Sequence, residues 1–124
     1  MATRQTIVAV VEDDLSVLRA IRDLLDALGV ATSVFSSAEE FLERGAEARP
    51  DCLLLDIHLG GMSGIDLSRR LAANSSTLPV IFMTALDDER TRMLAMQAGC
   101  VAFLRKPCAA RDLMDAIHTA VPPT

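Results

Sequence analysis

Acidic, hydroxyl and basic side chains follow four apolar segments of this 124-residue chain. They are Glu12 and Asp13 after the first segment, then Asp56, Thr84 and Lys106, one after each of three later segments. Carboxylates about 4 Å apart repel by roughly 4 kcal/mol per pair at an effective dielectric near 20. A hard divalent cation offsets this repulsion, and Mg²⁺ prefers one or two carboxylates together with waters and a phosphate oxygen. If these residues meet, we expect them to hold Mg²⁺ and a phosphoryl group.

Asp56 is the candidate nucleophile of this set. Carboxylates can act as nucleophiles and form an aspartyl phosphate, and Asp56 stands apart from the other acidic residues, before a loop light enough for a donor to approach. The Lys106 ammonium would pair with one phosphoryl oxygen, and the Thr84 hydroxyl would donate to another. Phosphoryl transfer depends mainly on positioning and charge stabilisation, which these groups would supply. Asp14 is interpreted as a favourable charge at a helix N-terminus.

Five apolar strands are expected to position these side chains, at 6–12, 31–35, 52–55, 79–84 and 101–106. Each is followed by a segment of helical periodicity, at 16–29, 36–45, 63–73, 88–99 and 110–121. Continuous apolar strands that alternate with helices indicate an α/β fold, with a parallel sheet covered on both faces. Ligands of such sheets bind beyond the C-terminal strand ends. The sequence therefore predicts that the candidate site residues meet at one edge of the sheet.

The start of the second helix carries two overlapping capping boxes, Ser36 with Glu39 and Ser37 with Glu40. In such a box the serine hydroxyl accepts from a backbone N–H of the first turn, and the glutamate reaches back to the N-cap. Gly45 is expected to end this helix. The two boxes cannot both define the same helix start.

Length and composition narrow the class of protein. A chain of 124 residues with 51% hydrophobic content can fill one core, so we expect a single domain over 1–124, with a core at about 6–121 and the start of a linker at 122–124. The net charge of −5 and the lack of Trp and Tyr disfavour nucleic-acid binding. Neither a signal peptide nor a membrane span is apparent, which favours a cytoplasmic location. The three cysteines are interpreted as reduced apolar filler.

Five motifs occur in the order VVEDD, LLLDI, MSG, FMTA and FLRKP, with 43 residues from Asp13 to Asp56, 28 onward to Thr84 and 22 to Lys106. Together they resemble the receiver domain of two-component response regulators, over about 6–121. The resemblance implies a doubly wound, flavodoxin-like (CheY-like) (βα)5 fold with strand order 2-1-3-4-5. The segments SAEEFL and DIHLGGMSG are similar to FixJ-like transcriptional regulators.

The resemblance also implies a role for each site residue. Asp56 would be the phosphoacceptor, and Glu12 and Asp13 would bind Mg²⁺ with it. The backbone carbonyl of His58 would complete the metal shell, and Lys106 would be the phosphate partner. Such a chain is a signalling switch that catalyses only its own phosphoryl transfer and dephosphorylation, and is not otherwise an enzyme.

Switching and partners follow from the same resemblance. Thr84 would be the switch hydroxyl and Phe103 the aromatic ring that turns inward with it, and a cis peptide is expected between Lys106 and Pro107. The donor would be a sensor histidine kinase or a phosphotransfer protein. The output would be a covalently linked DNA-binding domain outside this chain, with a possible dimer through the fourth helix, fifth strand and fifth helix. No membrane partner and no direct nucleic-acid binding are expected.

Three residues depart from the family pattern. Glu12 replaces the commoner aspartate and reaches one methylene further, so its metal contact could run through water. Gly60 stands where proline is usual, which predicts a more mobile 58–61 loop. Phe103 lacks the hydroxyl of a tyrosine, so hydrogen bonds of that group with partners would be lost.

Two other functions stay open from the sequence. A phosphatase of the haloacid-dehalogenase kind also uses Asp, Thr, Lys and Mg²⁺, although its two aspartates lie two apart after the first strand. Alternatively, the chain is a phosphorylation-independent binding module with a vestigial pocket, which would not bind Mg²⁺. The segment LGGMSG lacks the Lys-Ser/Thr pair of a phosphate-binding loop and is not interpreted as one.

Overall fold

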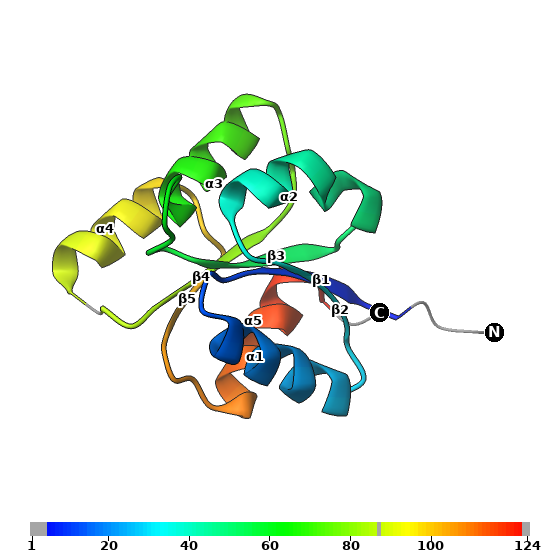
Figure 1. Cartoon of the computed structure of the whole chain (residues 1–124). Coiled ribbons are helices and arrows are strands. Elements are labelled where there is room, and N and C mark those ends of the chain that lie inside the picture. Colours follow the sequence, from blue (N-terminus) through cyan, green and yellow to red (C-terminus); the bar gives the residue numbers. More distant parts are fainter. Residues whose placement is uncertain (1–4, 87, 123–124) are drawn as a thin grey trace.

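The computed structural model describes residues 5–86 and 88–122, and shows a parallel sheet between two layers of helices (Figure 1). The strands lie in the order β2-β1-β3-β4-β5. They are β1 (Ile7–Val11), β2 (Ala31–Phe35), β3 (Cys52–Asp56), β4 (Val80–Thr84) and β5 (Ala102–Arg105). The helices are α1 (Leu15–Ala27), α2 (Ala38–Arg44), α3 (Gly64–Ala73), α4 (Glu89–Gln97) and α5 (Ala110–Ala120).

The predicted (βα)5 fold and strand order are confirmed, and every predicted element lies within two residues of an observed one at each end. A short 3₁₀ helix at Gly45–Ala48 was not predicted. It continues the chain after α2, so Gly45 ends the α-helix but not the helical path. Residues 123 and 124 of the expected linker start lie outside the described residues.

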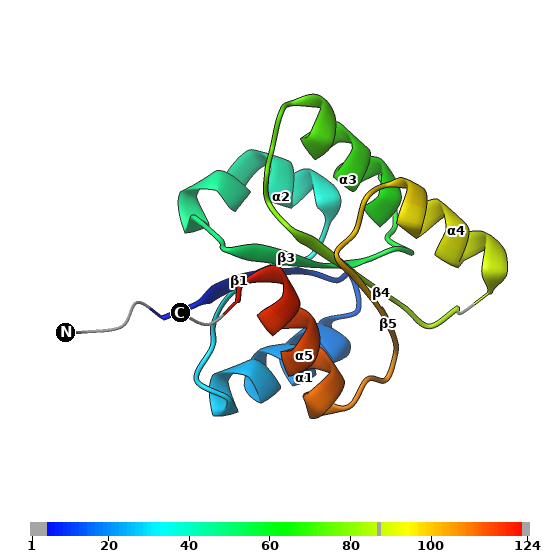
Figure 2. The same ribbon diagram turned by 180° about the vertical axis from the view of Figure 1, so that it is seen from behind.

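Two hydrophobic clusters fill the space between the sheet and its two helical layers. Helices α1 and α5 lie on one face, and α2, α3 and α4 on the other, as the view from behind also shows (Figure 2). Successive side chains of a strand point to opposite faces, so Val8 and Val10 pack in the cluster of α1 and α5, while Ala9 and Val11 pack in the other. Burial on both faces explains why the strands are continuously apolar.

The strand register sets the relative depth of the candidate site residues. Val11 of β1 pairs with Leu55 of β3, so the next residues, Glu12 and Asp56, lie at the same level. Strands β1 and β3 are neighbours in the sheet, although the chain first passes from β1 to β2, which lies on the opposite side of β1. This is the position where the strand order reverses and where open α/β sheets bind ligands.

The start of α2 resolves the overlap between the two predicted capping boxes. Ser37 is the N-cap, and its hydroxyl oxygen accepts from the Glu40 N–H at 3.0 Å. The Glu40 carboxylate accepts from the N–H of Ser36 at 2.9 Å, one residue before the N-cap. The box predicted between Ser36 and Glu39 is therefore wrong, and the Glu39 carboxylate instead accepts from the N–H of Met62.

Candidate functional site: an acidic pocket at the strand ends

Three carboxylates converge beyond the C-terminal ends of β1 and β3. Glu12 is fully buried and Asp56 is 3% exposed, whereas Asp13 is exposed. One carboxylate oxygen from each residue lies within 4.8 Å of the other two. The structure thus brings together the acidic residues that the sequence placed on two separate strands.

Lys106 is the cation that faces this group. Its ammonium donates to the Glu12 carboxylate, and also to Asp56 Oδ2 at 3.3 Å. Its side chain is 18% exposed, so the ion pairs are shielded from water over most of their surface. The one ammonium therefore pairs with two of the three carboxylates, and the cluster has more acidic groups than basic ones.

Burial and ion pairing together shift the pKa values of Glu12 and Lys106. Burial, assisted by a hydrogen bond to Asp56, raises the pKa of Glu12 to about 7, although the Lys106 ammonium acts in the opposite direction. Burial alone would lower the pKa of Lys106, but its hydrogen bond to Glu12 and the charge of Asp56 outweigh this and raise it. Glu12 therefore takes a proton more readily than an exposed glutamate would.

The donor set fits a hard divalent cation. Carboxylate oxygens meet here without a cysteine or histidine ring beside them in the cluster, which suits Mg²⁺ and not zinc. The His58 side chain is exposed, and the His58 N–H donates to Asp56 Oδ1 at 3.2 Å. Asp13 Oδ2 accepts from the N–H of Gly60 at 3.0 Å.

Asp14, next to this pair in sequence, caps α1 instead. Its Oδ1 accepts from the N–H groups of Ser16 and Val17 and from the Ser16 hydroxyl. These bonds lower the pKa of Asp14, the Ser16 hydroxyl contributing most. Its interpretation as a helix N-terminal charge agrees with this geometry.

Thr84 lies at the end of β4, and its hydroxyl is engaged by its own turn. Oγ1 accepts from the Leu86 N–H at 3.0 Å and donates to the Leu86 carbonyl at 3.3 Å. The side chain is fully buried. The Thr84 hydroxyl is thus bonded to the β4–α4 turn, and it could donate to a phosphoryl oxygen only by giving up its bond to the Leu86 carbonyl.

Phe103 lies on β5, half-buried on the face that α4 covers. The Arg92 guanidinium from α4 lies 5.3 Å from the centre of the Phe103 ring, a cation–π distance that stabilises the ring where it is. No motif in the sequence points to Arg92, because this contact joins two elements that only the fold brings together. The peptide bond between Lys106 and Pro107 is cis.

Comparison with known proteins identifies the family. Residues 8–118 match the family model of the response regulator receiver domain. The chain is 35% identical to response regulator protein TmoT of Ectopseudomonas mendocina, over 98% of this chain and 55% of that protein. It is 31% identical to transcriptional regulatory protein FixJ of Bradyrhizobium diazoefficiens, over 90% of this chain and 55% of that protein. The chain thus spans about half the length of these relatives.

The solved structures agree with the curated relatives. The crystal structure of FixJ-N superposes with a TM-score of 0.88 at 30% identity, covering 95% of this chain and 94% of that one. Within the described residues, no helix is both long and apolar enough to cross a membrane. The family-model match over residues 8–118 covers every strand and helix, including most of β1 and most of α5. This match removes the phosphatase alternative. The chain belongs to the receiver domain family of two-component response regulators.

Proposed function

We propose that Asp56 of this receiver accepts a phosphoryl group from a histidine kinase or a phosphotransfer protein. The observation that carries the proposal is the position of Asp56, buried between an acidic pair and a lysine at the switch point of the sheet. In the transfer, an Asp56 carboxylate oxygen forms a bond to phosphorus as the bond to the donor's imidazole nitrogen breaks. The imidazole leaves and is reprotonated from solvent.

Each pocket residue has a part in this transfer. Glu12, Asp13, Asp56 and the His58 carbonyl would hold Mg²⁺, which when bound neutralises charge on the phosphoryl oxygens. The Lys106 ammonium, already 3.3 Å from Asp56 Oδ2, stabilises negative charge beside the acceptor oxygen. The same pocket would later admit water for dephosphorylation, so the chain would catalyse the formation and loss of its own phosphoryl group.

The added charge would act on the switch residues. Once Asp56 is phosphorylated, the Thr84 hydroxyl would exchange the Leu86 carbonyl for a phosphoryl oxygen. That exchange would draw the β4–α4 turn inward and change the space open to Phe103. Phosphorylation would thus bias an existing equilibrium between two conformations.

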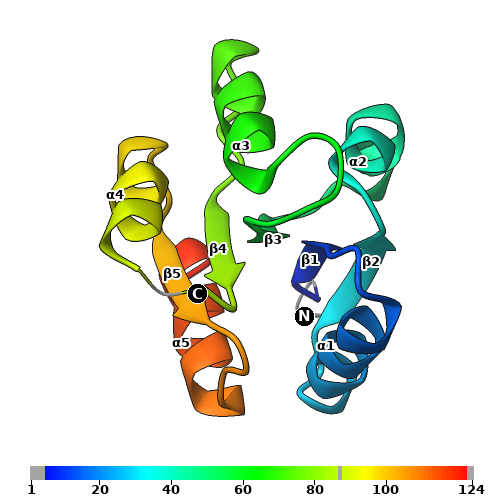
Figure 3. The same ribbon diagram turned by 60° about the vertical axis from the view of Figure 1, so that its left-hand side comes forward.

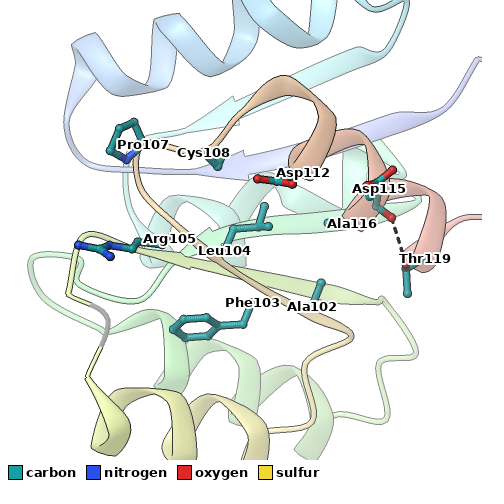
Figure 4. Close-up of a pocket in the computed structure, with 10 residues that line it drawn as sticks. All are labelled: Ala102, Phe103, Leu104, Arg105, Pro107, Cys108, Asp112, Asp115, Ala116 and Thr119. Atoms are coloured by element: carbon teal, nitrogen blue, oxygen red, sulfur yellow. Dashed lines mark hydrogen bonds between the residues drawn. The ribbon is translucent and has the colours of Figure 1, made fainter.

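The output surface would be made by α4, β5 and α5. A cavity of about 530 Å³ runs along β5 and α5, and its lining includes Phe103 and Leu104 of β5 and Asp112 and Asp115 of α5 (Figure 4). Met93 and Met96 of α4 are exposed. These features support this face as the place where a second copy or an output domain docks.

The output itself is proposed from the relatives. FixJ is a transcriptional regulatory protein by name and is about twice as long as the matched region. We propose that the present receiver likewise controls a linked DNA-binding domain, and that the protein works in the cytoplasm, where histidine kinases present their phosphoryl group. In this view 1–124 form one domain and 122–124 lead toward the output domain.

Mass spectrometry of the intact protein tests the acceptor. After incubation with acetyl phosphate and Mg²⁺, the wild type and the exposed-site control Asp66→Asn should each gain one phosphoryl group, whereas Asp56→Asn should gain none. Removing Mg²⁺ with a chelator should prevent the modification. A phosphoryl adduct on Asp56→Asn would show that another residue is the acceptor. A wild type that neither binds Mg²⁺ nor gains the adduct would favour a vestigial pocket.

A further inference from the structure

The loop between β3 and α3 presents three backbone N–H groups to three carboxylates. The N–H of His58 donates to Asp56 Oδ1 at 3.2 Å, and that of Gly60 to Asp13 Oδ2 at 3.0 Å. The N–H of Met62 donates to Glu39 Oε2 at 3.2 Å. Each acceptor comes from a different part of the chain, namely the end of β3, the turn after β1 and the first turn of α2. The loop is therefore held at alternate residues from three directions.

Two of these acceptors also belong to the acidic pocket, and Glu39 does not. Asp13 and Asp56 are among the three clustered carboxylates. Glu39 lies in α2, toward which the β3–α3 loop curves (Figure 3). A ligand that binds the carboxylates of Asp13 and Asp56 can weaken the hydrogen bonds that these two accept from the loop. The bond that Glu39 accepts from the Met62 N–H does not compete with such a ligand.

The loop sequence permits the contacts with Asp13 and Glu39. Gly60 can donate to Asp13 only because it has a backbone N–H, which a proline in its place would lack. At Gly61, φ is +75°, and a Cβ there would lie 2.7 Å from Glu39 Oε2. The Glu39 carboxylate thus occupies space that a side chain at residue 61 would take.

We propose that Glu39 is a positioning residue for the metal site of this receiver. By holding the Met62 N–H, it anchors the far end of the loop whose near end carries the His58 carbonyl and whose middle is bonded to Asp13. This inference rests on the proposed function, because the cation it concerns is the one that assists transfer to Asp56. Groups that orient metal ligands typically change metal affinity by 10–100-fold when removed. The exposed position of Glu39 places the expected effect near the lower end, at about 10-fold.

Calorimetric titration of the metal-free chain with MgCl₂ tests the proposal, with amide hydrogen exchange as an independent readout. Glu39→Ala should raise the Mg²⁺ dissociation constant by about 10-fold and speed the exchange of the Met62 and Gly60 amides. Glu39→Gln keeps an oxygen that can accept from Met62, so it should recover most of the affinity. Glu43→Ala, on the same helix, controls for loss of charge and of a long side chain and should behave as the wild type.

Three results would overturn the proposal. The first is an affinity of Glu39→Ala equal to that of the wild type, which would mean that the loop anchor does not affect the cation. The second is an equal loss in Glu39→Gln and Glu39→Ala, which would assign the effect to the charge and not to the hydrogen bond. The third is unchanged exchange at Met62. A wild type that binds no Mg²⁺ is a different result, because it would refute the proposed function as well.

Discussion

Substitution of Gly64 by alanine should damage both stability and the acceptor site. Gly64 begins α3, and its N–H donates to the carbonyl of Ile57 at 3.0 Å. A Cβ at this position would lie 2.2 Å from the carbonyl oxygen of Asp56 and 3.0 Å from the Ile57 Cα. Ordinary contact begins at 3.4 Å, so the helix start and the strand end must separate by roughly 1 Å.

The size of the loss follows from which atoms are in the way. Overpacking of a core costs about 1–3 kcal/mol, and here both sides are backbone, which cannot move aside as a flexible side chain would. We therefore expect Gly64→Ala to lower the free energy of unfolding by about 3 kcal/mol, less a fraction of 1 kcal/mol for the better helix propensity of alanine. The displaced Asp56 backbone should also slow phosphorylation by acetyl phosphate.

Gly60→Ala is the matched control, because it lies four residues away in the same connection. A Cβ there would meet its nearest atom, Asp13 Oδ2, at 3.7 Å, which is ordinary contact. Alanine keeps the N–H that donates to Asp13, so stability should change little or rise by about 0.4–1 kcal/mol. Urea denaturation followed by circular dichroism measures both variants. Equal stabilities for the two variants, with full phosphorylation of Gly64→Ala, would refute the steric reasoning.

Three further substitutions and modifications test the pocket and the core. Lys106→Met should lower the free energy of unfolding without Mg²⁺ by about 3 kcal/mol, because the buried Glu12 and Asp56 carboxylates lose the cation that pairs with them. Mg²⁺ should restore part of this loss in thermal unfolding, and an unchanged melting temperature would contradict the reasoning. Thr84→Ala should cost about 1 kcal/mol in urea denaturation because the Leu86 N–H loses its acceptor, and Thr84→Ser should cost less. Burial raises the pKa of the Cys52 thiol to about 12, which lowers its thiolate fraction. Iodoacetamide at about pH 8 should therefore modify Cys52 only after unfolding. Peptide mass spectrometry measures this, and labelling of Cys52 in the folded chain would contradict the prediction.

The positions of the strands and helices, and the residues at the strand ends, could be predicted from the sequence for a physical reason. Parallel strands buried on both faces must be continuously apolar, and their C-terminal ends must lie on one edge. Polar residues directly after such strands therefore meet there, and for this reason the sequence alone predicts that Glu12, Asp56 and Lys106 come together. The 3₁₀ helix at Gly45–Ala48 was missed because it has no apolar period of its own.

Contacts between elements distant in sequence were harder to predict. Glu39 matched a helix-capping pattern, and its actual bond to Met62 depends on where the β3–α3 loop passes α2. The expectation of a mobile 58–61 loop considered only the freedom of glycine. In the fold, Gly60 donates to Asp13, and whether this bond outweighs that freedom is what amide exchange would measure.

By itself, the sequence determined the order of strands and helices, the edge at which chemistry is possible, and the residue types gathered there, because periodicity and parallel pairing are local or topological properties. Only the tertiary structure decided which oxygen meets which donor. It joined Lys106 to both Glu12 and Asp56, and turned the Thr84 hydroxyl toward Leu86. It also placed the Glu39 carboxylate of α2 against the β3–α3 loop. Those pairings depend on side-chain directions and on packing between layers, where a shift of about 1 Å makes or breaks a hydrogen bond.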